Sequence, residues 1–277
     1  MRFGFVLPGG PVRLQVEQAM LADSAGWDAI FVWEAGYGPD AWTLLSAMAE
    51  RTSKVRLGTM LTPLPWRRPW KLASQVATLD ELSGGRAILA VGLGATDLGS
   101  WGEVTDRRER AELLDDGIDL IDALWSGATR YSGRRHAIDL SDHTWLVKSV
   151  SVVQRPRVPI WVVGVWPRRK SMRRVVRCDG ILPMVLDADG APGNLTPAEL
   201  REMLGWLDEN GGRRPGFDVV LDGETPADDP AAAAELVRPW AEAGATWWLD
   251  TRWALPRPDQ DNWRAVSQRL EAGPPVL

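Results

Sequence analysis

Residues 54–92, KVRLGTMLTPLPWRRPWKLASQVATLDELSGGRAILAVG, decide the fold of this 277-residue chain. Two apolar runs, 54–61 and 86–92, flank a segment, 69–82, whose apolar residues recur at helical spacing. Neither run alternates strictly between apolar and polar residues, which is typical of parallel strands covered on both faces. A proline opens the helical segment and Gly84 follows it, as expected at the two ends of a helix. These residues therefore predict a strand–helix–strand unit.

The same unit recurs along the whole chain. Strands are expected at residues 2–7, 28–33, 54–61, 86–92, 159–163, 179–183, 217–221 and 245–250. Helices are expected at residues 11–25, 39–52, 69–82, 106–125, 167–177, 196–210, 230–243 and 260–270. An open doubly wound sheet has a similar pattern, but eight repeats favour closure. The sequence predicts one α/β domain over residues 1–277, a (β/α)₈ TIM barrel.

Residues 126–158 interrupt this rhythm between the fourth helix and the fifth strand. They contain turn residues and β-branched residues but no helical period. We expect an inserted hairpin or long loop, because connections of this length are usually functional or packed over a barrel end. The insertion is a candidate lid.

Composition limits the classes of function. The net charge of -5 gives no reason to expect a nucleic-acid partner. The single cysteine, Cys178, rules out an internal disulfide and suggests a cytoplasmic protein. No run of 18 apolar residues predicts a membrane span, and the first ten residues do not resemble a secretory signal. The two histidines, His136 and His143, are too few for a zinc site or a histidine-driven triad, so no metal is expected.

Function in such a barrel is expected on the loops that follow the strands. After the second strand come Trp33 and Glu34. A carboxylate beside aromatic residues at this position suggests a proton donor or a partner for a cofactor ring. The alternative is a surface acid that caps the next helix, and the sequence leaves both open.

Two further strand ends carry polar or glycine-rich signals. The third strand is followed by Thr62 and then by Arg67 and Arg68, which either meet an anion or are solvated surface. The fourth strand ends at Gly92 and Gly94. A lone Gly-x-Gly is a weak signal for close approach of a phosphate or ring to the backbone.

After the fifth strand the sequence runs Gly164-Val165-Trp166-Pro167-Arg168-Arg169-Lys170. If the proline opens a helix, three cations crowd its first turn, where the helix dipole disfavours them. This placement suggests that Arg168 and Arg169 hold an anion such as a phosphate. A solvated helix face is the alternative.

Several segments together resemble a known family. They are 50–59 (ERTSKVRLGT), Thr62-Pro63, 68–73 (RPWKLA), 77–86 (ATLDELSGGR), 91–94 (VGLG), Gly26-Trp27-Asp28, 159–164 (PIWVVG), Trp166-Pro167 and Cys178-Asp179-Gly180. They closely resemble the bacterial luciferase-like monooxygenase superfamily, which includes oxidoreductases that depend on the deazaflavin coenzyme F-420. The resemblance covers residues 1 to about 183.

The resemblance implies a barrel that binds FMN or coenzyme F-420 at the carboxyl ends of its strands. Trp33 and Glu34 would border the ring, and Met60, Leu61 and Thr62 would form a bulge under it, where the family often has a non-prolyl cis peptide. The implied backbone and phosphate contacts are Gly92, Gly94, Gly164, Trp166, Arg168 and Arg169. The family also implies a homodimer.

The chain departs from the family pattern at two places. Relatives usually carry Asp-His after the tryptophan of the second strand, where this chain has Glu34-Ala35. Many deazaflavin enzymes have Glu where Ala95 follows Gly94. The missing histidine affects proton transfer at the ring, and Glu34 is the candidate proton-relay residue in this chain.

The predicted function is a flavin- or deazaflavin-dependent oxidoreductase, of the monooxygenase type if oxygen is used, acting on a small organic substrate. The first alternative is a barrel that binds a flavin without turnover. The second is a cofactor-free lyase or hydrolase, which the positions of the lysines and histidines disfavour. A rim plugged by tryptophan side chains would exclude the flavin hypothesis.

Overall fold

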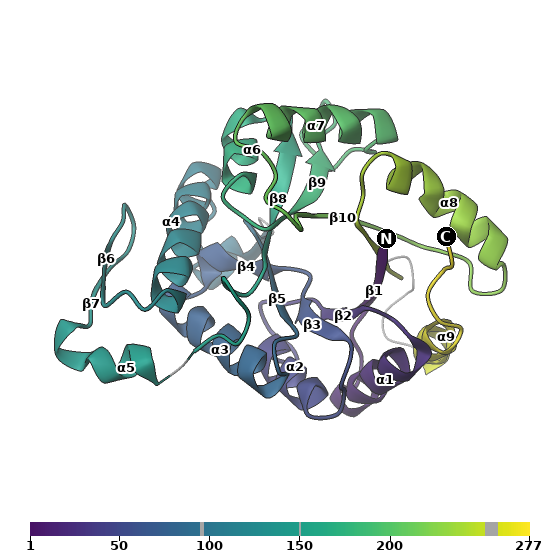
Figure 1. The fold of residues 1–277 in the computed structure, drawn as a ribbon, viewed down its shortest axis with the longest axis horizontal. Coiled ribbons are helices and arrows are strands. Elements are labelled where there is room, and N and C mark those ends of the chain that lie inside the picture. The colour runs from purple at the N-terminus through teal and green to yellow at the C-terminus, as the bar shows by residue number, and fades with distance from the viewer. Residues whose placement is uncertain (95–96, 150, 253–259) are drawn as a thin grey trace.

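The computed structural model describes residues 1–94, 97–149, 151–252 and 260–277. Eight parallel strands form a ring inside a layer of helices (Figure 1). The barrel strands are β1 (Arg2–Leu7), β2 (Ala29–Val32), β3 (Arg56–Thr59), β5 (Ala87–Gly92), β8 (Ile160–Trp166), β9 (Gly180–Val185), β10 (Asp218–Gly223) and β11 (Trp247–Asp250). The ring closes because β11 pairs with β1 and β3 pairs with β5. The predicted TIM barrel is confirmed.

The outer helices lie where the sequence predicts them, with shifted ends. They are α1 (Val12–Ala25), α2 (Ala41–Ala49), α3 (Pro69–Leu82), α4 (Arg107–Trp125), α6 (Arg169–Val175), α7 (Pro197–Glu209), α8 (Pro230–Glu242) and α9 (Gln260–Glu271). Two short 3-10 helices, η1 (Leu64–Trp66) and η2 (Asp97–Trp101), lie at the carboxyl end of the barrel. Helix α6 is shorter than predicted: it has seven residues and begins two residues after Pro167.

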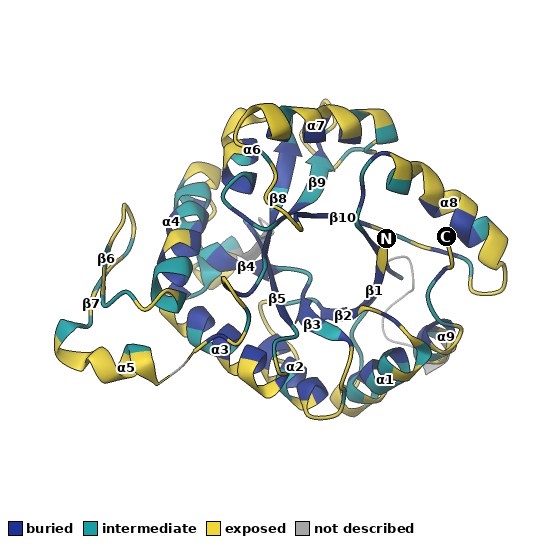
Figure 2. Cartoon of the chain, viewed as in Figure 1, coloured by how far each residue is buried: buried dark blue, intermediate teal, exposed yellow. Residues whose placement is uncertain are grey.

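Large side chains fill the inside of the barrel. Phe31, Trp161 and Trp247 are fully buried there. The ring centroids of Phe31 and Trp161 are 5.5 Å apart, and those of Trp161 and Trp247 are 5.4 Å apart. Gly180 makes room for one of them, since a Cβ at this position would lie 2.5 Å from the Trp161 ring. Figure 2 shows the same division across the molecule, with buried strands and helices that expose only their outer faces.

A buried carboxylate organises the amino-terminal end of the barrel. Asp218 accepts hydrogen bonds from the indole nitrogens of Trp161, at 3.0 Å, and Trp247, at 2.9 Å. Arg2 completes the cluster with an ion pair of 2.7 Å to Asp218 and a guanidinium over the Trp247 ring. Burial raises the pKa of Asp218 above its ordinary value, although Arg2 and the two indoles lower it. This end of the barrel is therefore filled.

The insertion contains the expected hairpin. Strands β6 (Arg130–Ser132) and β7 (Ala137–Asp139) pair in antiparallel register, followed by η3 (Ser141–His143) and α5 (Thr144–Lys148). In Figure 1 these elements project outward beside α3 and α4. The hairpin therefore lies on the side of the barrel, and this placement does not support the expected lid.

Asp116 of α4 holds the tip of the hairpin. Its carboxylate accepts hydrogen bonds from the Tyr131 hydroxyl, at 2.8 Å, and from the backbone nitrogens of Arg134, Arg135 and His136, at 2.9, 3.0 and 2.6 Å. Burial opposes ionisation of Asp116, but these hydrogen bonds outweigh it and lower the pKa below its ordinary value. The hairpin is thus fixed by an ionised group.

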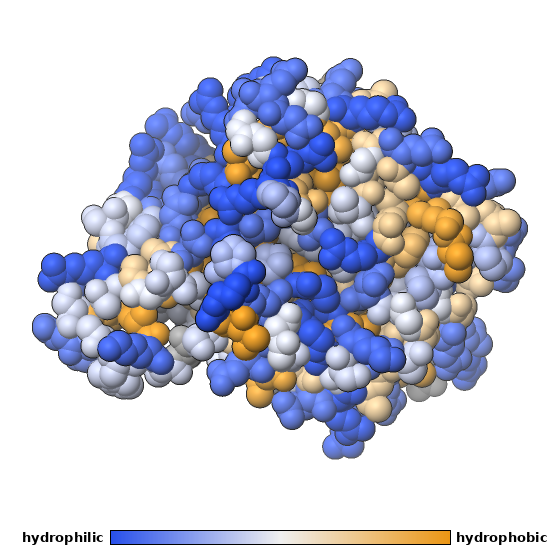
Figure 3. All heavy atoms as spheres, viewed as in Figure 1, coloured by the Kyte–Doolittle hydropathy of each residue, from blue (hydrophilic) through white to orange (hydrophobic). Residues whose placement is uncertain are grey.

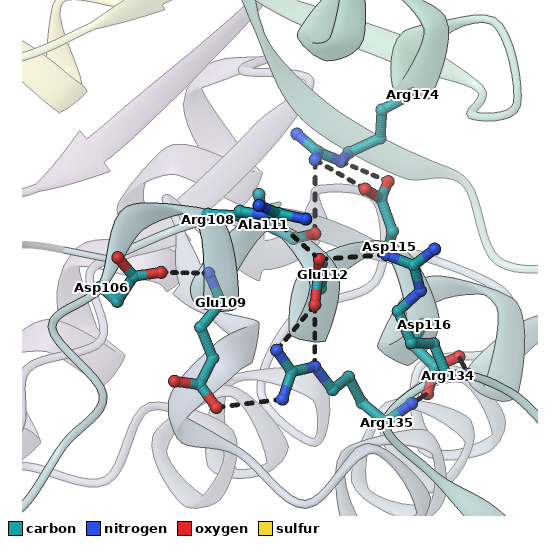
Figure 4. A network of polar contacts seen from close by, with 10 residues as sticks. All are labelled: Asp106, Arg108, Glu109, Ala111, Glu112, Asp115, Asp116, Arg134, Arg135 and Arg174. Atoms are coloured by element: carbon teal, nitrogen blue, oxygen red, sulfur yellow. Dashed lines mark hydrogen bonds and ion pairs between the residues drawn. The ribbon is translucent and has the colours of Figure 1, made fainter.

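Ion pairs extend this attachment along α4 (Figure 4). Arg135 of the hairpin lies 3.1 Å from Glu109 and 2.6 Å from Glu112. One turn further, Asp115 pairs with Arg174 of α6 at 2.7 Å. Helix α4 therefore joins the insertion to the barrel layer that carries α6.

The return from the insertion is fixed by a second buried acid. Asp80, at the end of α3, accepts hydrogen bonds from the backbone nitrogens of Val153, at 2.6 Å, and Gln154, at 3.1 Å. The Gln154 side chain adds a contact of 2.8 Å to the other oxygen. The sequence analysis contains this acid only as part of the family-like segment 77–86 and gives it no role.

The face of the molecule seen in Figure 3 is mostly hydrophilic, with small apolar patches over α8 and beside α5. Across the described ranges, no helix is both long and apolar enough to cross a membrane.

Replacing Asp218 with alanine is expected to destabilise the barrel strongly. The substitution leaves two buried indole N–H groups without an acceptor, and it removes the partner of the partly exposed Arg2 guanidinium. We expect the free energy of unfolding in urea to fall by about 3 kcal/mol. The control is Asp208→Ala, which breaks a surface pair with Arg213 and is expected to cost less than about 1 kcal/mol. Equal losses would contradict the role of Asp218.

Candidate functional site

A bulge interrupts the third barrel strand at the carboxyl end. The predicted strand 54–61 ends at Thr59, and the chain resumes pairing with β5 as β4 (Thr62–Pro63). Between them the Met60–Leu61 peptide is cis, as the family resemblance implies. Met60 and Leu61 pack against the side chains that fill the barrel interior. They form an apolar platform above the filled core.

A chain of polar contacts holds the bulge to the loop after β2. The Thr62 hydroxyl donates to Glu34 at 2.6 Å, and the Thr59 hydroxyl lies 2.8 Å from the Thr62 oxygen. Glu34 also pairs with Arg67, at 2.9 Å, and accepts from the Trp42 indole, at 3.3 Å. The Glu34 side chain is only 9% exposed. Both oxygens of this carboxylate are engaged, so the geometry favours a positioning role for Glu34.

A cavity of about 380 Å³, here called the basic cavity, opens beside the bulge. Its volume lies within the usual range of small-molecule sites. It lies over the carboxyl ends of β5, β8 and β9, between α4 and α6. Lining residues that matter for its chemistry are Leu61, Gly92, Gly94, Arg107, Arg110, Ser171 and Arg174.

Three arginines give the basic cavity its charge. Arg110 is 2% exposed and donates to the carbonyl oxygens of Leu93, at 3.3 Å, and Gly94, at 2.9 Å. Arg174 is paired with Asp115. Burial, together with the neighbouring charges of Arg168 and Arg110, lowers the pKa of Arg107.

Arg107 is the arginine available to a ligand. Within the part of the chain that the structure describes, no acidic side chain pairs with it. A guanidinium crowded by two others favours a bound anion, because an anion relieves the repulsion among them. The positive charge of Arg168 contributes to the lowered pKa of Arg107, although Arg168 does not itself line the cavity.

The glycines of the fourth strand end provide close packing. A Cβ at Gly92 would lie 2.9 Å from the Leu61 side chain, and one at Gly94 would lie 2.8 Å from the Trp66 ring. Gly94 also has a φ of +80°, which favours glycine. The indole nitrogen of Trp66 is buried and, among the described residues, has no hydrogen-bond partner. It is a donor for which a ligand can supply the acceptor.

Of the predicted site residues, Leu61, Gly92 and Gly94 line the basic cavity, and the others do not. Three of those others, Gly164, Trp166 and Arg169, pack between β8, α6 and their neighbours. Gly164 faces α6, and a Cβ there would lie 2.5 Å from Ile181. Trp166 packs near Trp206 of α7, with ring centroids 6.5 Å apart. The Arg169 guanidinium lies over both rings, at 5.3 Å and 5.0 Å from their centroids. These three residues stabilise the packing of β8 and α6 against their neighbours.

The sequence analysis missed Arg107, Arg110 and Ser171. Arg107 and Arg110 are three residues apart, so they share one face of α4. That spacing is the signal that could have found them. Ser171 accepts from the backbone nitrogen of Val165 at 3.0 Å and so fixes the turn between β8 and α6. Ala95, a departure from the family, lies outside the described residues.

A second cavity, here called the aromatic cavity, lies over β1 and β2 and has a volume of about 350 Å³. Trp33 forms part of its wall. A Cβ at Gly9 would lie 3.3 Å from the Trp33 indole nitrogen, and one at Gly10 would lie 2.8 Å from that of Trp263. The two glycines therefore let the tryptophans of β2 and α9 approach the first loop.

Comparison with known proteins identifies the family. A model described as luciferase-like monooxygenase matches residues 1–272. The chain belongs to this family. The luciferase-like match therefore continues beyond residue 183, where the sequence resemblance stops.

Relatives of the luciferase-like family include enzymes named for coenzyme F-420. A putative coenzyme F-420-dependent oxidoreductase of Mycobacterium tuberculosis is 29% identical over 246 residues, covering 83% of this chain and 67% of the relative. An F-420-dependent glucose-6-phosphate dehydrogenase of Kineococcus radiotolerans is 31% identical over 243 residues, covering 82% and 68%.

Solved structures support the luciferase-like fold. An F-420-dependent secondary alcohol dehydrogenase, in complex with an F-420-acetone adduct, has a TM-score of 0.74 at 16% identity, with 97% of both chains covered. A type II Baeyer-Villiger monooxygenase of Pseudomonas putida in complex with FMN has a TM-score of 0.61 at 19% identity, covering 86% of this chain and 71% of that one.

Glu34→Ala is expected to loosen the bulge. The change removes an acceptor from Thr62, Arg67 and Trp42 at a site with little access to water. We expect the free energy of unfolding to fall by about 2 kcal/mol, measured in urea. Glu17→Ala, an exposed acid in α1, is the control and is expected to change it by less than about 0.5 kcal/mol. No difference between the two variants would exclude the positioning role.

Proposed function

We propose that this chain is an oxidoreductase that uses coenzyme F-420 or FMN and acts on a small organic substrate. The observation that carries the proposal is the basic cavity beside the Met60–Leu61 bulge. It combines an apolar platform, glycine backbone and the Arg107 guanidinium, which has no acidic partner among the described residues, at the carboxyl end of the barrel. Family membership and the named relatives support the same conclusion.

The residues present fit a flat ring with an anionic tail. Leu61, Gly92 and Gly94 would hold the ring side, where apolar surface and backbone meet. Arg107 and Arg168 would hold the phosphate.

The cofactor, when bound, supplies the hydride or oxygen chemistry of the reaction. The protein binds, orients and excludes water. Met60 and Leu61 present an apolar surface next to the cavity, and Glu34 keeps that surface in place through Thr62. In this proposal Glu34 acts as a positioning residue, which differs from the proton relay expected from sequence.

The alternative of a barrel without turnover was motivated by Glu34-Ala35 in place of Asp-His. The contacts of Glu34 give this departure a structural explanation that does not require loss of activity. Family membership favours an enzyme.

Titration with each cofactor tests the proposal. The titration is followed by cofactor fluorescence, and FMN or coenzyme F-420 is expected to bind at micromolar or lower concentration. Arg107→Glu and Arg168→Glu should each weaken binding roughly tenfold or more, because each turns an attraction for the phosphate into a repulsion.

Arg169→Glu is the matched control, since Arg169 neighbours Arg168 in sequence but lies over Trp166 and Trp206. We expect less than about a threefold change in affinity for this variant. If neither cofactor binds below high-micromolar concentration, the proposed function fails. If Arg168→Glu and Arg169→Glu behave alike, the phosphate position is wrong.

We further propose that the protein is a cytoplasmic homodimer. Its only cysteine, Cys178, is buried, which agrees with a reducing compartment. Exposed apolar side chains support self-association, since Trp70 is 42% and Trp145 64% exposed beside an apolar groove between α3, α4 and the insertion.

Sedimentation velocity checks the oligomeric state. We expect twice the mass of the chain, and a shift towards monomer for the double variant Trp70→Glu and Trp145→Glu, because charge at an apolar interface is unfavourable. The double variant Arg130→Glu and Arg134→Glu, on the exposed hairpin, is the control. A monomeric wild-type protein would refute the dimer.

A further inference from the structure

We propose that the aromatic cavity binds the substrate, and that this substrate is a flat, uncharged molecule with a hydroxyl or N–H donor. The inference rests on the proposed function, because it assigns the substrate side of the same site. It goes further by naming the substrate class.

The shape and lining of the aromatic cavity favour a planar apolar ligand. Its volume of about 350 Å³ is suited to a small bicyclic molecule. Trp33, Tyr37 and Trp263 contribute rings to the wall, and Pro8 and Pro39 add rigid apolar surface. Tyr37 is 89% exposed, so it stands at the mouth. Aromatic walls of this kind contact flat rings favourably.

The aromatic cavity differs from the basic cavity in charge. None of the described residues that line it is an aspartate, glutamate, lysine or arginine. A phosphate or carboxylate bound there would lose hydration without gaining a counter-charge. The basic cavity, by contrast, has three arginines in its wall. In this proposal the basic cavity takes the anionic tail of the cofactor, and the aromatic cavity takes the uncharged substrate.

Gln15 indicates the polar group of the ligand. This side chain is only 3% exposed, and its Nε2 donates to the carbonyl oxygen of Gly10 at 2.9 Å. That bond fixes the amide and leaves Oε1 as an acceptor that no described donor reaches. A ligand hydroxyl or N–H can donate to this oxygen, because the carbonyl oxygen of an amide side chain accepts hydrogen bonds.

The two cavities lie on either side of the bulge. Val32, which lines the aromatic cavity, accepts a hydrogen bond from the Met60 nitrogen at 2.8 Å. Leu61, the next residue, lines the basic cavity. In barrel order, β1 and β2 come before β3, and β5 and β8 come after it. In this proposal a ligand in the aromatic cavity approaches the platform from the side of β2.

Calorimetric titration with three matched probes tests the inference. The probes are 2-naphthol, 2-methoxynaphthalene, which lacks the donor, and 2-naphthyl phosphate, which adds charge. Against the cofactor-loaded protein, 2-naphthol should bind, and each of the other two should bind about tenfold more weakly or worse. Gln15→Leu should remove the difference between 2-naphthol and 2-methoxynaphthalene, as expected for a specific pair.

Variants of the wall locate the binding. Trp263→Ala should weaken 2-naphthol about tenfold while cofactor affinity stays unchanged, and Trp263→Phe should retain most of the binding. The same titration with cofactor-free protein and with Arg107→Glu separates the substrate cavity from the proposed cofactor site. There, 2-naphthol should still bind even when cofactor affinity is lost.

The inference is overturned if 2-naphthyl phosphate binds as tightly as 2-naphthol. It is equally overturned if Trp263→Ala leaves 2-naphthol binding unchanged, or if added cofactor displaces the probe. Failure of cofactor binding with intact 2-naphthol binding would refute the proposed function and leave the cavity assignment standing.

Discussion

The hydrogen bonds that converge on Asp218 determine where this protein can have a site. They fix Trp161 and Trp247 inside the amino-terminal end of the barrel, and Arg2 covers them. The basic cavity and the aromatic cavity both lie at the opposite end. Trp161 and Trp247 are therefore at the closed end of the barrel, and they do not plug the rim at which the flavin hypothesis places the cofactor. At the carboxyl end, Trp33 and Trp263 line the aromatic cavity.

Most of the fold was predictable from sequence because its information is local. Each buried strand and each outer helix has its own periodicity, and eight repeats imply closure. The site was only partly predictable. Val163 and Val165 line the basic cavity, whereas Gly164 between them faces α6, since successive strand residues point to opposite faces. A shift of one residue at a strand end therefore exchanges the residues that face the cavity with those that face the helices. The spacing of residues in the sequence does not decide between the two.

Contacts between distant elements account for the other differences. Glu34 is a strand-end acid in the sequence, but its partner Arg67 lies in a loop 33 residues later, so its role appears only in the fold. Arg107 and Arg110 belong to a helix that the sequence analysis treated as outer packing. Arg168 and Arg169 are neighbours in the chain, yet the charge of one contributes to the lowered pKa of Arg107 and the other covers two indole rings. The sequence therefore indicated that arginines would bind an anion, but only the structure shows which arginines are placed to do so.

The insertion has two points of attachment, Asp116 at the hairpin tip and Asp80 at its return. Both acids belong to helices of the barrel layer, so each anchor is independent of the residues that connect them. The intervening stretch, 137–152, can then gain or lose residues over evolution without moving either anchor or the catalytic rim. Homologues should accumulate their length differences there, and this part of the surface can diversify while the chemistry stays the same.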